Sequence, residues 1–191
     1  MIEEALLFTQ QSLNQFLMNR FGNRDKNVVL NVVVDDDNST PMINQNKMVI
    51  SLINIENESS RPYYNKPQYT PNGSYTHVNP TERFNLDILI TSNFQDYSET
   101  LKFLNGTLTF FQVNSTMSNQ SHSFFPDALE KLHFELVKMN FDQMHSLWSA
   151  MGAKYRPSMV YKMRLISIQG EEVTTYNELV REVIENVVPN G

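Results

Sequence analysis

The order of two hydrophobic patterns along the chain is the strongest constraint on its fold. Alternating apolar residues are typical of strands, and apolar residues spaced three and four apart are typical of helices. Along this chain the patterns predict a helix, three strands, and then a helix, a strand, a helix, a strand and a helix. A doubly wound parallel fold needs strict alternation of strand and helix. We therefore predict an α+β fold with one mixed, largely antiparallel sheet and helices packed on it.

The helical patterns cover residues 2–21, 94–111, 141–151 and 175–188. Gly22 ends the first helix, and Asn93 is the expected N-cap of the second. The second helix carries an apolar stripe at helical spacing that we expect to face the core. Its members are Phe94, Tyr97, Leu101, Leu104, Leu108 and Phe111.

The strand patterns cover residues 28–34, 47–58, 83–91, 131–139 and 158–168. The first is a β-branched run that we expect to be covered on both faces, and the second reads as an interior strand. The strand at 83–91 alternates cleanly, which predicts one face toward solvent. Pro157 precedes the last strand, and because proline cannot donate to a ladder, we expect that strand near a sheet edge. Residues 35–39 form a polar turn, and residues 114–123 a polar loop.

A long segment rich in proline and tyrosine, residues 59–81, interrupts these patterns. Loops of this length are uncommon in compact domains unless they serve a purpose. Aromatic side chains are favoured at contact hot spots, so the segment is a candidate contact arm. Its tyrosines are Tyr63, Tyr64, Tyr69 and Tyr75. The alternative is an ordered surface loop that these tyrosines hold in place. At 191 residues, and with roughly 150 residues per domain, we expect one domain over residues 1–191.

Composition argues against several kinds of chemistry. The chain has no cysteine, which excludes disulfides, thiolate metal sites and a Cys nucleophile. Its four histidines never form a HExxH pair, and the nucleophile-elbow and phosphate-loop motifs are absent. Glu56 and Glu58 share a strand face and permit a paired-carboxylate site, although polar residues at a strand end are the alternative. We expect no enzyme activity, no cofactor and no metal site.

Charge and hydropathy restrict the partners. The net charge of -6 has the wrong sign for binding a phosphate backbone, so we expect no nucleic acid. No apolar run approaches the roughly 20 residues that span a bilayer, so we expect no membrane insertion. The first residues lack the cationic lead and apolar core of a signal peptide. We therefore expect synthesis in the cytoplasm.

Three segments together are more specific than any of these motifs. They are ISLINIENES at 50–59, FFQVN at 110–114 and LWSAMGAKYRPSMVYKMRLI at 147–166, preceded by EALLFTQQSLNQFL at 4–17. In this order they resemble the cap or tail-terminator family of phage-tail-like contractile injection systems, of the anti-feeding-prophage and virulence-cassette type, which is type VI-like. The resemblance covers residues 1 to about 168. It is weakest at 59–81, and the tail after Ile168 is unmatched.

The resemblance implies a structural part of the particle. Such proteins form a ring, expected to be a hexamer, on the end of the inner tube and outer sheath, where they stop polymerisation and fix the particle's length. The expected partners are other copies of this chain and the sheath and tube proteins. The finished protein would then be part of the contractile particle, released or held at a membrane.

Sheath subunits of the family are linked by extended arms that add strands to neighbouring sheets. The resemblance therefore implies that a free sheet edge accepts the last arms by β-augmentation. Tyr161, Lys162 and Arg164 lie on the strand expected near an edge, so they are interface candidates, with internal packing as the alternative. Glu56 and Glu58 are candidates to meet basic groups of a neighbouring protomer.

Two other functions stay open at this point. One is a head-to-tail connector or tail-completion protein of a phage, which needs a partner on the capsid side. The other is a small-ligand binding domain whose tyrosine-rich segment closes on a sugar or nucleoside.

Overall fold

The computed structural model describes residues 1–22, 26–57, 68–69, 75–76, 82–168 and 176–177. The chain divides into two compact units. Residues 1–58 and 82–168 form the first, and residues 59–81 and 169–191 form the second. The expectation of one domain over residues 1–191 stays a prediction.

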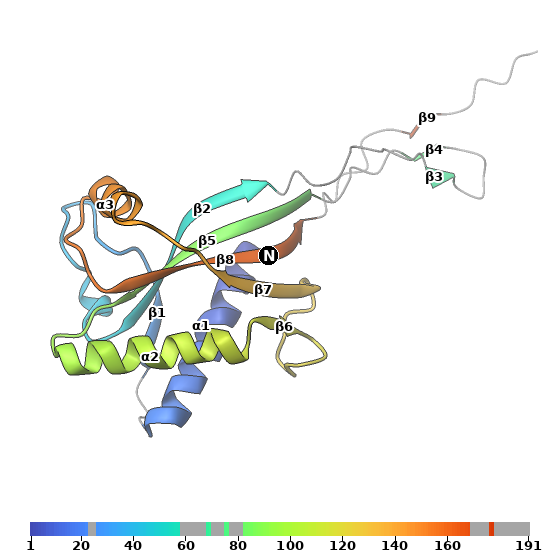
Figure 1. The fold of residues 1–191 in the computed structure, drawn as a ribbon. Helices are drawn as coiled ribbons and strands as arrows, with labels where there is room; N and C mark the ends of the chain where they lie inside the picture. Colours follow the sequence, from blue (N-terminus) through green and yellow to red (C-terminus); the bar gives the residue numbers. More distant parts are fainter. Residues whose placement is uncertain (23–25, 58–67, 70–74, 77–81, 169–175, 178–191) are drawn as a thin grey trace, which may run out of the picture. The chain divides into compact units, whose positions relative to one another are not determined.

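The first unit is built on a six-stranded mixed sheet, in the order β1-β2-β5-β8-β7-β6 (Figure 1). Only β1 and β2 are parallel among these pairs, and the other four pairs are antiparallel. The strands are β1 (Val28–Leu30), β2 (Met48–Asn57), β5 (Glu82–Ser92), β6 (Thr116–Ser118), β7 (Lys131–Leu136) and β8 (Ser158–Ile168). The predicted α+β class with a mixed, largely antiparallel sheet is confirmed.

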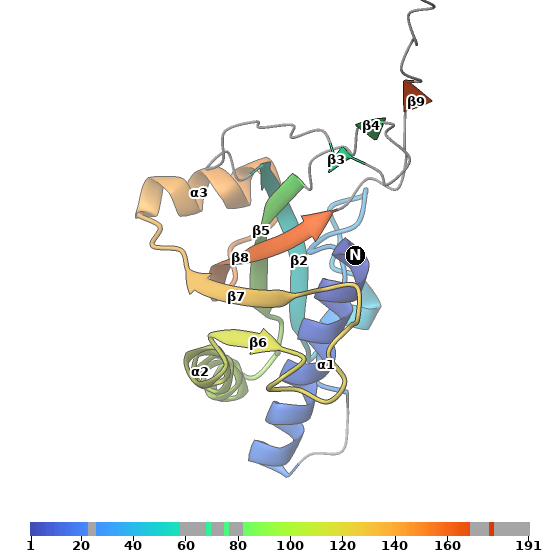
Figure 2. The same ribbon diagram turned by 90° about the vertical axis from the view of Figure 1, so that its right-hand side faces the viewer.

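Helices cover both faces of this sheet. Both views place α1 (Ile2–Phe21) and α2 (Tyr97–Val113) on one face and α3 (Phe141–Ala150) on the other (Figures 1 and 2). A short 3-10 helix, η1 (Met42–Asn44), lies in the connection between β1 and β2. The predictions of α1 and α3 are confirmed. Gly22 ends α1 in the left-handed conformation, at φ 65°, and Asn140 caps α3 with a capping box.

The core lies on both sides of the sheet because its central strands are buried on both faces. On β5, Ile88 and Ile90 belong to the large cluster with α1 and α2, whereas Leu89 packs with Trp148 of α3. The prediction that this strand has one face toward solvent is therefore wrong over its central part. Asn85 and Thr91, which alternate with the apolar residues of the strand and so fall on the face expected toward solvent, are 6% and 1% exposed.

The start of α2 also differs from the prediction. Its N-cap is Asp96, whose Oδ1 accepts a hydrogen bond from the Ser98 backbone N–H at 2.8 Å. Asn93 instead donates from Nδ2 to the Asn44 carbonyl oxygen at 2.9 Å, which ties the start of the helix region to η1. Both residues have suitable side chains, and the tertiary contact with η1 decides between them.

The packed face of α2 agrees only in part with the stripe that periodicity selected. Phe111 is buried and Phe94 and Leu104 pack against the core, as expected. Phe103 and Phe110 also face the core, together with small residues such as Gly106 and Thr107. Tyr97, Leu101 and Leu108 are exposed. The small residues mark the packed face because α1 crosses there closely. A Cβ on Gly106 would lie 2.7 Å from Leu17 Cδ2 and 3.0 Å from the Phe21 ring.

Three further predictions need correction. The strand expected at 28–34 ends at Leu30 and lies at the sheet edge. The polar stretch 114–123 contains β6, which pairs with β7. The strand at 158–168 lies between β5 and β7 rather than near an edge. Pro157 sits just before β8, where its carbonyl accepts from the Ser92 N–H at 3.0 Å, so it needs no edge position.

The second unit contains a small antiparallel sheet in the order β3-β4-β9. Its strands are β3 (Gln68–Tyr69), β4 (Tyr75–Thr76) and β9 (Tyr176–Asn177). The segment expected to be a loop at 59–81 thus carries two short strands. Tyr176–Asn177, at the start of the helix expected over 175–188, is a strand, and the rest of that expected helix lies outside the described residues.

We predict that Gly106→Ala destabilises the protein, by about 1 kcal/mol, although alanine is the better helix former. Overpacking against Leu17 costs roughly 1–3 kcal/mol, which exceeds the gain in helix propensity of about 1 kcal/mol. In a Leu17→Ala background the shorter contact is removed and the 3.0 Å contact with the Phe21 ring remains, so the same substitution should be clearly less destabilising. Urea denaturation of the four proteins measures both effects. A stabilising Gly106→Ala in the wild-type background would contradict the close helix crossing.

Candidate protein interface

A row of charged side chains crosses the sheet on the face that α3 partly covers. Lys162 of β8 donates from Nζ to Glu56 Oε2 of β2 at 2.6 Å, and the same Nζ lies 3.9 Å from Asp87 Oδ1 of β5. Arg164 of β8 pairs with Glu135 of β7, with Nη2 at 2.7 Å from Oε2 and Nε at 2.9 Å. These five side chains are called the charged row. It joins four neighbouring strands.

Lys162 is the centre of this row. Its pKa is raised, chiefly because Glu56 accepts its hydrogen bond, with the charges of Asp87 and Glu56 acting in the same direction against desolvation and Arg164. Asp87 is 13% exposed, and its Oδ2 accepts from Asn54 Nδ2 at 3.1 Å. Lys162 itself is 23% exposed, so its pair with Glu56 is partly buried. Arg164 and Glu135 are 38% and 55% exposed, and such exposed pairs contribute about 0–1 kcal/mol each. The row therefore presents ordered charges to solvent more than it stabilises the fold.

The structure brings together three of the residues singled out in the sequence and separates a fourth, Tyr161. Glu56 and Arg164 share the charged row, through Lys162. Tyr161 points to the opposite face, is 4% exposed and stacks on Phe111 with ring centroids 4.2 Å apart. Burial raises the pKa of Tyr161 to about 12. Tyr161 therefore packs inside the protein, which was the alternative to an interface contact. It does so because neighbouring residues of a strand point to opposite faces.

The remaining interface candidates lie in or near the second unit. Tyr69 and Tyr75 sit opposite each other in the register of β3 and β4. Glu58, Tyr63 and Tyr64 lie outside the described residues. The contact role of these residues stays a prediction.

The outer side of β2 forms an unpaired sheet edge that the sequence did not reveal. β1 pairs only with Met48–Ile50 of β2, and the Asn31 N–H donates to the Ile50 carbonyl where the two strands part. Within the described residues, no strand pairs with the outer side of residues 52–57. This stretch is called the open edge. It escaped prediction because the apolar run 28–34 suggested a longer neighbouring strand.

The chemistry of the open edge follows from a bulge. Leu52 pairs with Ile88 and Asn54 with Asp87, so Ile53 is an extra residue in β2. By the alternation of an antiparallel ladder, Ile55 then turns its backbone N–H and C=O away from β5. Leu52 and Ile55 are 36% and 47% exposed. The edge thus offers backbone hydrogen-bonding groups flanked by apolar side chains, with Glu56 nearby.

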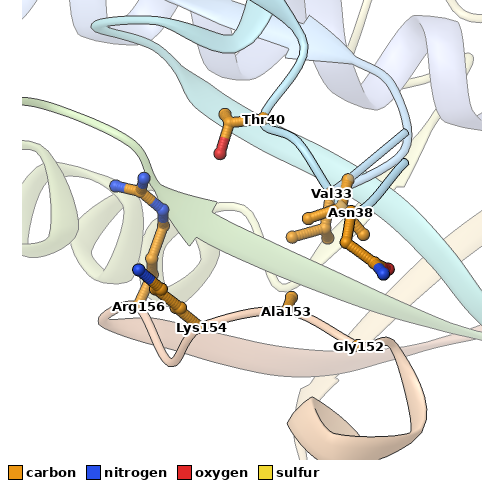
Figure 3. Close-up of a pocket in the computed structure, with 8 residues that line it drawn as sticks. Val33, Asn38, Thr40, Gly152, Ala153, Lys154 and Arg156 are labelled. Atoms are coloured by element: carbon orange, nitrogen blue, oxygen red, sulfur yellow. The ribbon is translucent and has the colours of Figure 1, made fainter. Parts of the chain in front are cut away.

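A pocket of about 400 Å³ lies at the C-terminal end of α3 (Figure 3). The helix ends in a Schellman motif, in which Ala153 N–H donates to the Trp148 carbonyl and Gly152 N–H to the Ser149 carbonyl. Gly152 has φ 64°, and a Cβ there would lie 2.7 Å from Asn38 Oδ1. Glycine therefore allows the chain to turn beside Asn38 and form one wall of the pocket.

The opposite wall comes from the connection after β1. This pocket, called the basic pocket, is lined by Val33, Val34, Asn38, Thr40, Gly152, Ala153, Lys154 and Arg156. The polar turn predicted at 35–39 is confirmed, with the Asp35 N–H bonded to the Ser39 carbonyl at 2.9 Å. Hydrogen bonds from Ser39 lower the pKa of Asp37. Sequence reasoning missed this pocket because its two walls lie more than 100 positions apart.

In the described part of the chain, no group of three or more His, Asp or Glu side chains is arranged to hold a metal ion. None of the helices in the same residues combines the length and apolar character needed to cross a membrane.

Comparison with known proteins identifies a family. The family model described as Pvc16 N-terminal domain matches residues 9–182. No curated protein matches the chain. The resemblance to cap and terminator proteins that we predicted from the sequence is confirmed.

Two similar solved structures come from contractile injection systems. One is the PVC sheath/tube terminator of an extracellular contractile injection system in its extended state, at 14% identity and TM-score 0.50. The other is the tube-terminating cap of the anti-feeding prophage, at 15% identity and TM-score 0.52. The alignments cover 94% and 92% of this chain but 64% and 60% of those chains. At these identities the likeness is one of fold, and this chain spans less than two thirds of either protein.

We expect Tyr161→Phe to make the protein more resistant to alkali. Because burial raises the pKa of Tyr161 from 10.0 to about 12, its contribution to stability is complete below about pH 10 and is lost as the pH rises toward 12. The loss amounts to about 2 kcal/mol. Urea midpoints at pH 8 and pH 11.5 should therefore differ less for Tyr161→Phe than for the wild type. Tyr97→Phe, which removes an exposed phenol, is the control. An equal loss in Tyr161→Phe and wild type would contradict the assignment.

Proposed function

The chain belongs to the Pvc16 N-terminal domain family, and we propose that it caps the inner tube and sheath of a contractile injection system. The two similar structures are a sheath/tube terminator and a tube-terminating cap, which supports this role. In this proposed role the chain is a structural part of the particle and not an enzyme. We further propose that its copies close into a ring, expected to be a hexamer.

The open edge of β2 is the observation that carries the proposal. A tube or sheath grows by head-to-tail contacts, so each completed layer exposes the surface on which the next layer adds. A cap has to satisfy that surface without reproducing it. An unpaired strand edge satisfies an extended arm through main-chain hydrogen bonds. We therefore assign the open edge as the acceptor of the last sheath arms.

The side chains around the edge define what such an arm should carry. Leu52 and Ile55 are exposed on one face, so the arm should place apolar side chains beside them. Glu56 is 42% exposed on the other face and is already paired with Lys162. A basic side chain of the arm can join that pair and extend the charged row by one strand.

The other two functions have no comparable support. A small-ligand domain closed by tyrosines requires tyrosine side chains around a pocket, and the lining of the basic pocket contains none. A head-to-tail connector requires a capsid-side surface, and nothing in the described residues favours one.

Deleting the gene should give particles of variable and often excessive length, because nothing then halts addition to the tube and sheath. Negative-stain microscopy of assembled particles measures the length distribution. Complementation with the wild-type gene is the control and should restore uniform particles. Uniform particles of normal length in the deletion strain would contradict the cap function.

Ile55→Pro should abolish binding to sheath while leaving the protein folded. The Ile55 N–H points away from β5, so proline removes a donor from the open edge without removing a bond inside the sheet. We expect co-sedimentation with purified sheath to fall by roughly tenfold or more, as expected for loss of a strand-addition site. The matched control is Ile55→Ala, which shortens the side chain but keeps the N–H.

Circular dichroism should show the same fold for both variants. Retained sheath binding by folded Ile55→Pro would reject the open edge as the acceptor. That result would leave the particle-length test as the separate measure of the cap function.

A further inference from the structure

The basic pocket holds two cations that have no carboxylate partner in the described residues. Lys162, Arg164 and Lys102 form ion pairs, whereas cations such as Lys47 and Lys138 form none in the described part of the chain. The two cations of the pocket differ from these by lining one cavity. Lys154 and Arg156 form none among the described residues, and no acidic side chain lines their pocket. Lys154 is exposed and Arg156 is half-buried, so the charged ends of both side chains are accessible to an anionic group that enters the pocket.

Both cations line the same pocket. Figure 3 shows the side chains of Lys154 and Arg156 on the segment that follows Ala153, with Thr40 on the opposite wall. Tyr155, between them in sequence, instead contacts Trp148, with ring centroids 5.7 Å apart at 66°. This contact and the Schellman motif at Gly152 hold the segment that carries both charges against the end of α3.

The rest of the lining is apolar or neutral. Val33, Val34 and Ala153 provide aliphatic surface, and Asn38 and Thr40 provide neutral hydrogen-bonding groups. A pocket of about 400 Å³ is large enough for a few side chains of a bound segment. The combination of two cations and aliphatic surface matches a ligand that carries carboxylates beside small apolar groups.

We propose that the basic pocket binds an acidic peptide segment of a partner protein, with its carboxylates on Lys154 and Arg156 and a neighbouring aliphatic side chain on Val33 and Val34. Arg156 offers a planar fork of donors suited to a carboxylate, and Lys154 adds a flexible point charge. This binding site does not depend on the proposed cap function.

The charges around the pocket favour a short acidic segment over nucleic acid. Asp35, Asp36 and Asp37 lie on the same connection as Val33, Val34, Asn38 and Thr40. A long phosphate backbone leaving the pocket would meet these carboxylates and the net charge of -6. A short peptide can end or turn before it reaches them.

Fluorescence anisotropy with a short labelled peptide of alternating Glu and Val tests the proposal, with a Gln and Val peptide as the matched probe. The wild-type chain should bind the acidic peptide saturably and the neutral peptide at least roughly tenfold more weakly. Lys154→Ala/Arg156→Ala should weaken binding of the acidic peptide by a similar factor. Arg20→Ala/Lys102→Ala removes the same charge from α1 and α2, and its binding should stay within about twofold of wild type.

Further arms exclude other occupants. Arg156→Lys keeps the charge and should retain part of the binding. Circular dichroism of Lys154→Ala/Arg156→Ala should match the wild type, so that its loss of binding does not come from unfolding. Equal binding of the two peptides, or equal weakening by the two double variants, would overturn the proposal. Tighter binding of a single-stranded oligonucleotide than of the acidic peptide would overturn it in favour of a phosphate site. A change in oligomeric state of Lys154→Ala/Arg156→Ala without peptide binding by wild type would overturn it in favour of a second copy.

Discussion

Burial of the central strands on both faces is the constraint on which the rest of the structure depends. Because Ile88 and Leu89 of β5 point to opposite sides and are both inaccessible to solvent, the sheet needs cover on each side. The helices α1 and α2 provide it on one face through a crossing so close that Gly106 has no room for a side chain. On the other face Trp148 of α3 covers Leu89 and Val160. The end of α3 is thereby held above the sheet, and the basic pocket forms where its chain turns back.

The candidate interface begins where this cover stops. Towards the C-terminal part of β2 the side chains change from buried to exposed, although pairing with β5 continues to Asn57. The charged row replaces the buried apolar pairs there, and ion pairs between its members hold their side chains in place. An unpaired edge with exposed leucine and isoleucine promotes unwanted association, and natural sheets usually protect such edges with proline, lysine or a covering segment. Residues 52–57 contain neither proline nor lysine. Their exposure makes sense if a partner strand covers them.

The sequence predicted elements better than it predicted their neighbours. The hydrophobic patterns of α1, α3, β2 and β8 were sufficient to predict the type of each element, because a single periodicity dominates each segment. In α2 apolar residues lie on two faces, so periodicity alone could not choose between Tyr97 and Phe103, and the signal for the packed face was the small residue Gly106. The position of β8 failed for another reason. Pro157 has no N–H to donate, but because it precedes β8, it carries no information about which strands lie on either side of β8.

The two ends of the sheet are built alike, because each edge strand, β1 and β6, has three residues and pairs with only part of a longer neighbour. Past β1, residues 52–57 of β2 have no strand on their outer side within the described residues, and past β6 the outer side of β7 continues only to Leu136. Very short edges are poor templates for further pairing. The stretch on β2 is the longer of the two and offers more main-chain hydrogen bonds to an added strand, which is the physical reason to place a partner strand there and not beside β7.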